Sequence, residues 1–183
     1  MASNYQIVEI DAAEATSRLL ELSEILVDAV TSGASVSFMM PFTVTEAIAY
    51  WQTILPAVAQ GDKILLVALV EGRAVGTVQL SLTTPPNQSH RADIAKLLVH
   101  RQARGQGIAR SLMQRLEQVA LSQGRTLLTL DTMTDSIAEQ LYLSLGYVLV
   151  GKIPNYAYFP DGSLGDTSFL YKQLVAKSPS PAY

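Results

Sequence analysis

The stretch Arg104-Gly105-Gln106-Gly107-Ile108-Ala109 joins a run of strand-forming residues to an amphipathic segment. Apolar residues spaced four, four and three apart follow it, namely Ile108, Leu112, Leu116 and Val119, and this spacing predicts a helix that ends near Gly124. Glycine lets the backbone approach an anion closely, and the first N–H groups of a helix have no partner inside the helix. The stretch therefore predicts a cradle for a phosphate group where a strand meets a helix.

Positive charge surrounds this stretch, because Arg101, Arg104 and Arg110 lie in or beside it. The pattern alone also fits a glycine-rich helix start that binds no ligand. Two nucleotide fingerprints do not fit: no Lys-Ser or Lys-Thr pair follows the glycines, and the third glycine of the dinucleotide fingerprint is absent. The spacing therefore argues against both a P-loop protein and a dinucleotide-dependent oxidoreductase.

On both sides of this stretch, segments typical of strands alternate with segments typical of helices. The predicted strands are 5–10, 63–70, 77–82, 91–100, 126–131, 147–150 and 167–174, with a loop between the last two. Three further helices open at the capping pairs Asp11 with Glu14, Thr43 with Glu46 and Ser136 with Glu139, and the first of them runs through Val30. We expect an α+β fold in which a mixed, mostly antiparallel twisted sheet of about seven strands carries helices on both faces.

Composition limits what the protein can do. The chain has 183 residues, of which 49% are hydrophobic, so we expect a single domain over residues 1–176 and a flexible tail over 177–183. The net charge of -3 argues against nucleic acid as a partner. The absence of cysteine excludes disulfides, a thiolate nucleophile and a Cys-ligated metal, and we expect no metal site.

Neither a targeting segment nor a membrane span is predicted. Residues 1–9 lack a basic stretch followed by an apolar one, and the apolar run 64–70 is too short to cross a bilayer. We expect a cytoplasmic protein without a membrane partner. The sequence leaves open whether the protein is a monomer or a homodimer.

The pattern Arg-x-x-Gly-x-Ala over residues 104–109 resembles the pyrophosphate motif of the GNAT acetyltransferase superfamily. Residues 96–99 resemble the central strand that precedes this motif, and residues 138–147 resemble the C-terminal helix and the strand after it. Within the superfamily, the chain is most similar to the tabtoxin-resistance acetyltransferase group. The segments that carry this closer likeness are 33–39, 78–82, 130–132 and 153–156.

The resemblance implies that acetyl-CoA is the cofactor and that the sheet is splayed between its central strands. It implies that the main chain of Leu97, Leu98 and Val99 pairs with the pantetheine arm. The residues implied for the pyrophosphate are Arg104, Gly105, Gln106, Gly107, Ile108, Ala109 and Arg110. Asp135, Ser136 and Tyr142 are implied to lie beside the arm and the thioester. Many members carry Asn where this chain has Asp135, which argues against a side-chain bond from that position to the cofactor.

A chain without cysteine favours direct attack of a substrate amine on the thioester. The amine must lose a proton, because alkylamines have a pKa of about 10.4. Asp93 and Asp131 are the candidate bases, and either can instead act as an anionic clamp for the ammonium group. The resemblance implies a main-chain N–H near Leu98 or Val99 for the oxyanion, and Tyr142 as the acid that protonates the departing thiolate. Helical spacing alone also fits Tyr142 as a core aromatic.

Aromatic and methionine residues are the candidates for the acceptor pocket. Tyr156 and Tyr158 are the stronger ones, because exposed aromatic residues in a loop need an explanation. Phe38 and Met39 are the weaker ones, since such residues often belong to a core. The resemblance implies acetylation of the primary amine of a small amino-acid-like molecule, as in toxin or antibiotic resistance. The alternatives are another amine (an aminoglycoside, a polyamine or a protein N-terminus) and a non-catalytic acyl-CoA-binding regulatory protein.

Overall fold

Seven strands form one sheet in the computed structural model, which describes residues 4–175. The strands are β1 (Gln6–Ile10), β2 (Lys63–Val70), β3 (Arg73–Ser81), β4 (Arg91–Val99), β5 (Leu127–Met133), β6 (Val148–Tyr158) and β7 (Leu164–Gln173). Their order is β1-β2-β3-β4-β5-β7-β6, and only the β4 and β5 neighbours are parallel. The expected mixed, mostly antiparallel sheet is confirmed. The predicted tail 177–183 lies outside the described residues.

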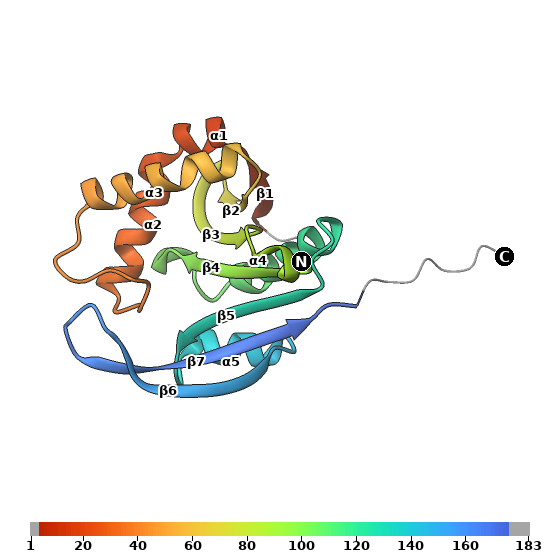
Figure 1. Cartoon of the computed structure of the whole chain (residues 1–183). Helices are drawn as coiled ribbons and strands as arrows, with labels where there is room; N and C mark the ends of the chain where they lie inside the picture. Colours follow the sequence, from red (N-terminus) through yellow and green to blue (C-terminus); the bar gives the residue numbers. More distant parts are fainter. Residues whose placement is uncertain (1–3, 176–183) are drawn as a thin grey trace.

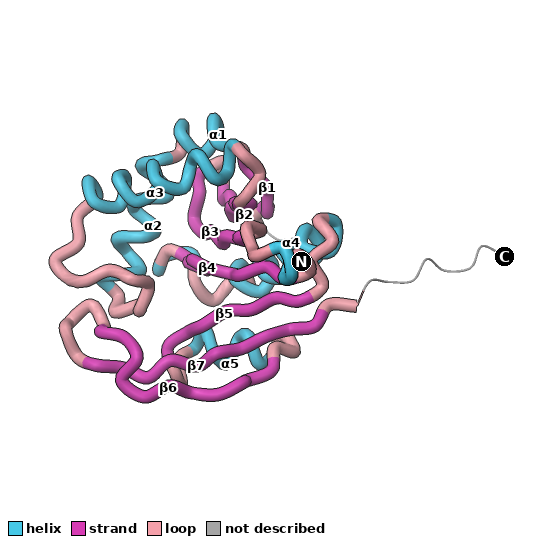
Figure 2. The backbone as a smooth tube through the Cα atoms, in the orientation of Figure 1, coloured by secondary structure: helices cyan, strands magenta, loops and turns pink. Residues whose placement is uncertain are grey.

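Helices cover both faces of this sheet (Figures 1 and 2). The helices α1 (Ala12–Ser17), α2 (Leu19–Thr31) and α3 (Val44–Ala59) pack on one face, and α4 (Ile108–Ser122) and α5 (Ile137–Ser144) on the other. Two hydrophobic clusters result, one on each face. In β2, Leu65 and Val67 belong to the cluster under α1, α2 and α3, while Leu66 and Ala68 belong to the cluster under α4 and α5. Because both faces of β2 are buried, this strand is apolar throughout.

The sheet opens between β4 and β5. These strands pair only over Arg91–Leu127, Ala92–Leu128 and Asp93–Thr129, and beyond Asp93 they no longer form a ladder. The same level of β4 carries a bulge, because Thr77 pairs with Leu98 whereas Gln79 pairs with Ala95. Lys96 lies in the bulge with a positive φ of 53°. The expected splay therefore begins just after Asp93, and the β4 main chain that faces β5 has no strand partner there.

Two local predictions were wrong. The single helix expected from Asp11 through Val30 is broken at Arg18, where φ is -104° and ψ is 13°. The guanidinium group of Arg18 contacts Glu14 and Glu21 and donates to the Gly72 carbonyl, so this corner is tied to the turn between β2 and β3.

The second wrong prediction is the loop before residue 167, since most of it is strand. β6 continues to Tyr158 and β7 begins at Leu164, with an irregularity between Ile153 and Ala157. Pro154 lies inside this irregularity, and β6 is an edge strand, so the missing N–H breaks no internal ladder. The prediction failed because proline is a reliable breaker only for central strands.

None of the helices in the described part of the chain is long and apolar enough to cross a membrane.

Candidate active site

The loop between β4 and α4 presents main-chain donors. After a 3₁₀ turn (Arg101–Ala103), Gly105 and Gly107 adopt φ values of 78° and 80°, a region that favours glycine. Gly107 is the N-cap of α4 and supplies no capping side chain. Within residues 4–175, no main-chain N–H group of residues 105–110 donates a hydrogen bond to the protein. A row of free N–H groups at the start of a 15-residue helix suits an anion such as a diphosphate.

A buried carboxylate holds this loop in place. Asp28, on α2, has a side chain only 7% exposed, and its Oδ2 accepts the N–H of Arg101 at 2.9 Å. Its carboxylate also contacts Arg101 Nε, and it accepts Arg104 Nη2 at 3.1 Å. His100 Nε2 lies 3.8 Å from Oδ1. Asp28 therefore joins α2 to the three residues that lead into the glycine loop.

Asp28 was missed at the sequence level, although a signal was present. Asp28 is a charged residue among the apolar residues Ile25, Leu26, Ala29 and Val30 of α2. A carboxylate is rarely buried unless it is paired, so its place among these residues indicates a cationic partner. Which cation that is depends on tertiary contacts across more than seventy residues and is not visible in the local pattern.

The arginines near the loop are directed toward the protein. Arg104 donates from Nε to the Val99 carbonyl at 2.9 Å as well as to Asp28, and Arg110 Nη2 contacts Ser144 Oγ at 2.8 Å. The positive charge that the sequence indicates here is thus partly matched by Asp28. The free groups left in the loop are the main-chain N–H groups.

Residues at the start of α5 make local contacts. Ser136 is the N-cap, and its hydroxyl accepts the N–H of Glu139 at 3.1 Å. Asp135 has a φ of 58°, and its carboxylate accepts the Lys152 ammonium group at 2.9 Å. This contact directs the Asp135 side chain to Lys152 on β6.

Tyr142 is buried on α5, with 6% of its surface exposed, and its ring lies 5.7 Å from that of Tyr147. Its hydroxyl forms no hydrogen bond within the described chain. Burial, and secondarily the negative charge of Asp131, raise the pKa of Tyr142 above its ordinary value of about 10. The hydroxyl therefore stays protonated at neutral pH and can act as a proton donor.

The two candidate carboxylates lie in different environments. Asp93, the last β4 residue paired with β5, accepts the Thr129 hydroxyl and contacts Arg91 Nη2 at 3.3 Å. Asp131 lies two residues beyond Thr129 on β5, is exposed, and accepts no hydrogen bond from residues 4–175. Asp93 is already engaged, whereas Asp131 is free to receive an amine.

The predicted acceptor residues come from two segments that meet. Phe38 packs against Phe42 with ring centroids 4.4 Å apart, and Met39 beside it is 45% exposed. On the other segment, Tyr156 packs edge-on against Phe169 at 5.4 Å, and Tyr158 is 60% exposed. The loop between α2 and α3 approaches the turn between β6 and β7 (Figure 1), where Met40 N–H donates to the Pro160 carbonyl at 2.9 Å.

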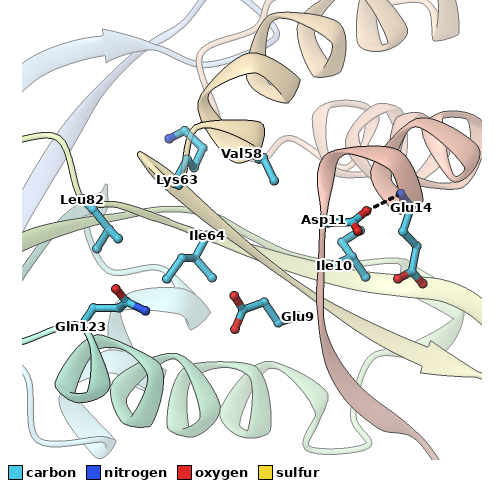
Figure 3. Close-up of a pocket in the computed structure, with 10 residues that line it drawn as sticks. Glu9, Ile10, Asp11, Glu14, Val58, Lys63, Ile64, Leu82 and Gln123 are labelled. Carbon is cyan, nitrogen blue, oxygen red and sulfur yellow. Dashed lines mark hydrogen bonds between the residues drawn. The ribbon is translucent and has the colours of Figure 1, made fainter.

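A cavity of about 450 Å³ lies elsewhere, between the end of β1, the start of β2 and the C-terminal ends of α3 and α4 (Figure 3). Its lining includes the acidic residues Glu9, Asp11 and Glu14, and Asp11 is used to cap α1 by accepting the Glu14 N–H at 2.8 Å. None of the predicted site residues lines it. Across the described residues, no group of three His, Asp or Glu side chains is arranged to hold a metal ion.

Comparison with known proteins identifies the family. The model of the Acetyltransferase (GNAT) family matches residues 29–147. The chain therefore belongs to the GNAT acetyltransferases, a family of acyltransferases whose cofactor is acetyl-CoA.

Sequence relatives and solved structures agree with this family. N-acetyltransferase 8B of Rattus norvegicus is 39% identical over 110 residues, which are 59% of this chain and 47% of that protein. The Homo sapiens N-acetyltransferase 8B is 36% identical over 88 residues, which are 47% of this chain and 39% of that protein. The chain thus spans less than half the length of these curated relatives.

Two solved structures show the shared fold. An N-acetyltransferase from Staphylococcus aureus Mu50 matches with a TM-score of 0.76 at 23% identity, over 94% of this chain and 100% of that one. The yncA protein of Salmonella typhimurium, solved with its cofactor acetyl-CoA, matches with a TM-score of 0.75 at 20% identity, over 98% and 99% of the two chains.

Proposed function

We propose that this protein is an N-acetyltransferase that uses acetyl-CoA to acetylate the primary amine of a small amino-acid-like molecule, as the likeness to the tabtoxin-resistance group implies. We propose residues 1–176 as its single domain. The observation that carries the proposal is the row of free N–H groups at residues 105–110, placed directly after the strand β4 that separates from β5. Membership of the GNAT family supports the same chemistry.

The free N–H groups of the loop and the unpaired side of β4 support this choice of cofactor. The N–H groups of residues 105–110 would hold the diphosphate, and the β4 main chain at Leu97, Leu98 and Val99 would pair with the pantetheine arm. When bound, acetyl-CoA supplies the thioester whose acetyl group is transferred. Asp28 supports this binding from outside by fixing the loop that carries the donors.

Three groups of the chain would then serve the reaction. Asp131 accepts the ammonium group of the acceptor and is the stronger candidate for the base, because Asp93 is engaged by Thr129 and Arg91. A main-chain N–H near Leu98 or Val99 stabilises the oxyanion. The Tyr142 hydroxyl, kept protonated by burial, gives its proton to the departing thiolate.

An acetylation screen tests this proposal. Amines with a free carboxylate, aminoglycosides, polyamines and peptides with free N-termini are each mixed with enzyme and acetyl-CoA, and both acetylated product and released thiol are measured. We expect amino-acid-like amines to give product. Saturable binding of acetyl-CoA with no product from any class would contradict the proposal and favour the non-catalytic binding protein.

A further inference from the structure

Lys96 is a half-buried cation that the proposed mechanism does not use. It lies in the β4 bulge, at the level where β4 and β5 separate, with a positive φ of 53° that is unusual for a residue other than glycine. Its side chain lies on the sheet face that carries α3, since Nζ donates to the Val36 carbonyl at 2.9 Å. A long charged side chain at a strained position is costly, which suggests that it serves a purpose there.

The surroundings of Lys96 are aromatic rather than acidic. Nζ lies 5.5 Å from the ring centroids of both Phe38 and Tyr50. No carboxylate of residues 4–175 lies within 4.0 Å of it. An ammonium group has three N–H donors, and the Val36 carbonyl uses one of them. Two donors of a partly desolvated cation are thus left for a partner outside the described chain.

Lys96 and Asp131 form a pair of opposite charges at the opening of the sheet. Burial lowers the pKa of Lys96 and the negative charge of Asp131 acts in the opposite direction, while the same Asp131 charge contributes to raising the pKa of Tyr142. The strand pairing also brings the two residues to the same opening. Asp93 and Thr129 are the last paired residues of β4 and β5; Lys96 lies three residues beyond the first and Asp131 two residues beyond the second. A small molecule whose amine meets Asp131 between the separating strands would therefore have Lys96 on the facing strand.

We infer that Lys96 binds an anionic group of the acceptor, a carboxylate or a group of similar charge, while the acceptor's amine meets Asp131. This inference rests on the proposed function and narrows it: the acceptor is a zwitterion, and its anion is recognised by a charge-assisted hydrogen bond between the rings of Phe38 and Tyr50. The segment that carries Phe38 and Val36 would thus contribute to specificity through Lys96.

Matched acceptor pairs test the inference. Each amino acid that serves as acceptor is compared with its carboxamide, which keeps the amine and the size but removes the negative charge. We expect the wild-type protein to prefer the carboxylate in kcat/KM by about 10- to 100-fold, the range of a hydrogen bond to a charged group. Lys96→Met should abolish most of this preference by lowering the rate for the carboxylate alone, and Lys96→Arg should restore part of it.

Lys63→Met is the matched control. Lys63 is also a half-buried lysine on the same face of the sheet, bonded to the Ser81 hydroxyl, and its pKa is likewise lowered by burial. This variant should keep the carboxylate preference. If the wild-type protein shows no preference, or if Lys96→Met slows the carboxylate and the carboxamide equally, Lys96 only pins the Val36 segment and the inference is wrong.

A binding measurement separates this inference from the proposed function. N-acetyl-L-methionine and its carboxamide, which carry the acetylated amine of an amino acid and need no turnover, are titrated into wild-type and Lys96→Met protein and followed by NMR. Tighter binding of the carboxylate that depends on Lys96 supports the inference even if no amine is acetylated. Turnover of amines together with equal, Lys96-independent binding of the two probes overturns the inference and leaves the proposed function standing.

Discussion

The proposed cofactor side and the proposed acceptor side of this protein are built in different ways. On the proposed cofactor side, the donors are main-chain N–H groups of one short segment, residues 105–110, at the start of one helix. On the proposed acceptor side, the groups are side chains from four separate segments, represented by Phe38, Lys96, Asp131 and Tyr156. A backbone cradle can be recognised from glycine spacing, whereas a pocket made of side chains is defined only when the strands and loops are assembled.

This difference has a consequence for mutations. Side-chain changes on the cofactor side should act mainly through backbone conformation and so affect affinity for acetyl-CoA. Side-chain changes on the acceptor side should act directly on rate or on choice of acceptor.

Tyr142→Phe should lower kcat by at least about 100-fold, the usual range for loss of a general acid, with the affinity for acetyl-CoA nearly unchanged. The control is Tyr147→Phe, because Tyr147 is an adjacent buried tyrosine whose hydroxyl also lacks a partner within the described residues. Steady-state kinetics and calorimetry measure the two effects. Equal, small losses in both variants would show that Tyr142 is only a core residue.

The pH profile sharpens the same prediction. Burial raises the pKa of Tyr142, so the hydroxyl remains protonated above the ordinary tyrosine pKa of about 10. Titration of Tyr142 should therefore not lower the activity of the wild-type protein near pH 10. Above pH 9, the activity profiles of wild type and Tyr142→Phe should have the same shape. A loss near pH 10 that is absent from Tyr142→Phe would mean that the hydroxyl titrates normally and is not desolvated.

Asp131→Asn should lower kcat/KM by about 10- to 100-fold, and Asp93→Asn by clearly less, because only Asp93 is already engaged by Thr129 and Arg91. The effect on kcat and KM distinguishes the two roles of Asp131. Removal of a general base lowers kcat, whereas removal of a clamp for the ammonium group mainly raises KM for the acceptor. A larger loss in Asp93→Asn would reverse the assignment.

Gly105→Ala should weaken acetyl-CoA binding about tenfold, because a Cβ at positive φ costs about 1–2 kcal/mol and shifts the neighbouring N–H groups. Gly72→Ala is the control: Gly72 has a φ of 81° against 78° for Gly105, and neither glycine has an atom within 4 Å of an added Cβ. Both variants should lose similar thermal stability. Only Gly105→Ala should lose affinity in calorimetry, and equal affinities would contradict the cradle.

Asp28→Asn should raise KM for acetyl-CoA several-fold while kcat is retained, because Asp28 positions the loop without being placed against the cofactor. The variant should also be less stable by about 3 kcal/mol, the lower end of the cost of breaking a buried ion pair. Glu24→Gln, which removes the partner of the exposed Arg73, is the control and should change neither quantity. A fall in kcat with unchanged KM would argue against a positioning role.

The sequence predicted much of the fold because the signals were local. The capping pairs at Thr43 and Ser136 are present, and the continuous apolar run of β2 is a strand buried on both faces. The prediction failed at Arg18, where the helix breaks and the side chain bonds the distant Gly72 carbonyl, and at Pro154, whose tolerance depends on β6 being an edge strand. Both failures depend on tertiary neighbours.

The candidate site follows the same division. The glycine loop was found from its spacing, and Asp93 and Asp131 were named without any means of ranking them. Their difference arises from the last β4–β5 pair, which brings Thr129 to Asp93 and leaves Asp131 beyond it. Asp28 and Lys96 were missed because their proposed roles depend on distant contacts. Asp28 bonds Arg101, and Lys96 bonds Val36; the partners in each pair are at least sixty residues apart in the chain.

We propose that the main-chain N–H groups of residues 105–110 hold the diphosphate of coenzyme A. The most direct test is an NMR titration of the amide signals of Gly105, Gly107 and Ala109, first with coenzyme A and then with pantetheine, which lacks the diphosphate. We expect large shifts of these signals with coenzyme A and almost none with pantetheine. Shifts of equal size with both ligands, or unchanged signals at saturating coenzyme A, would contradict this proposal.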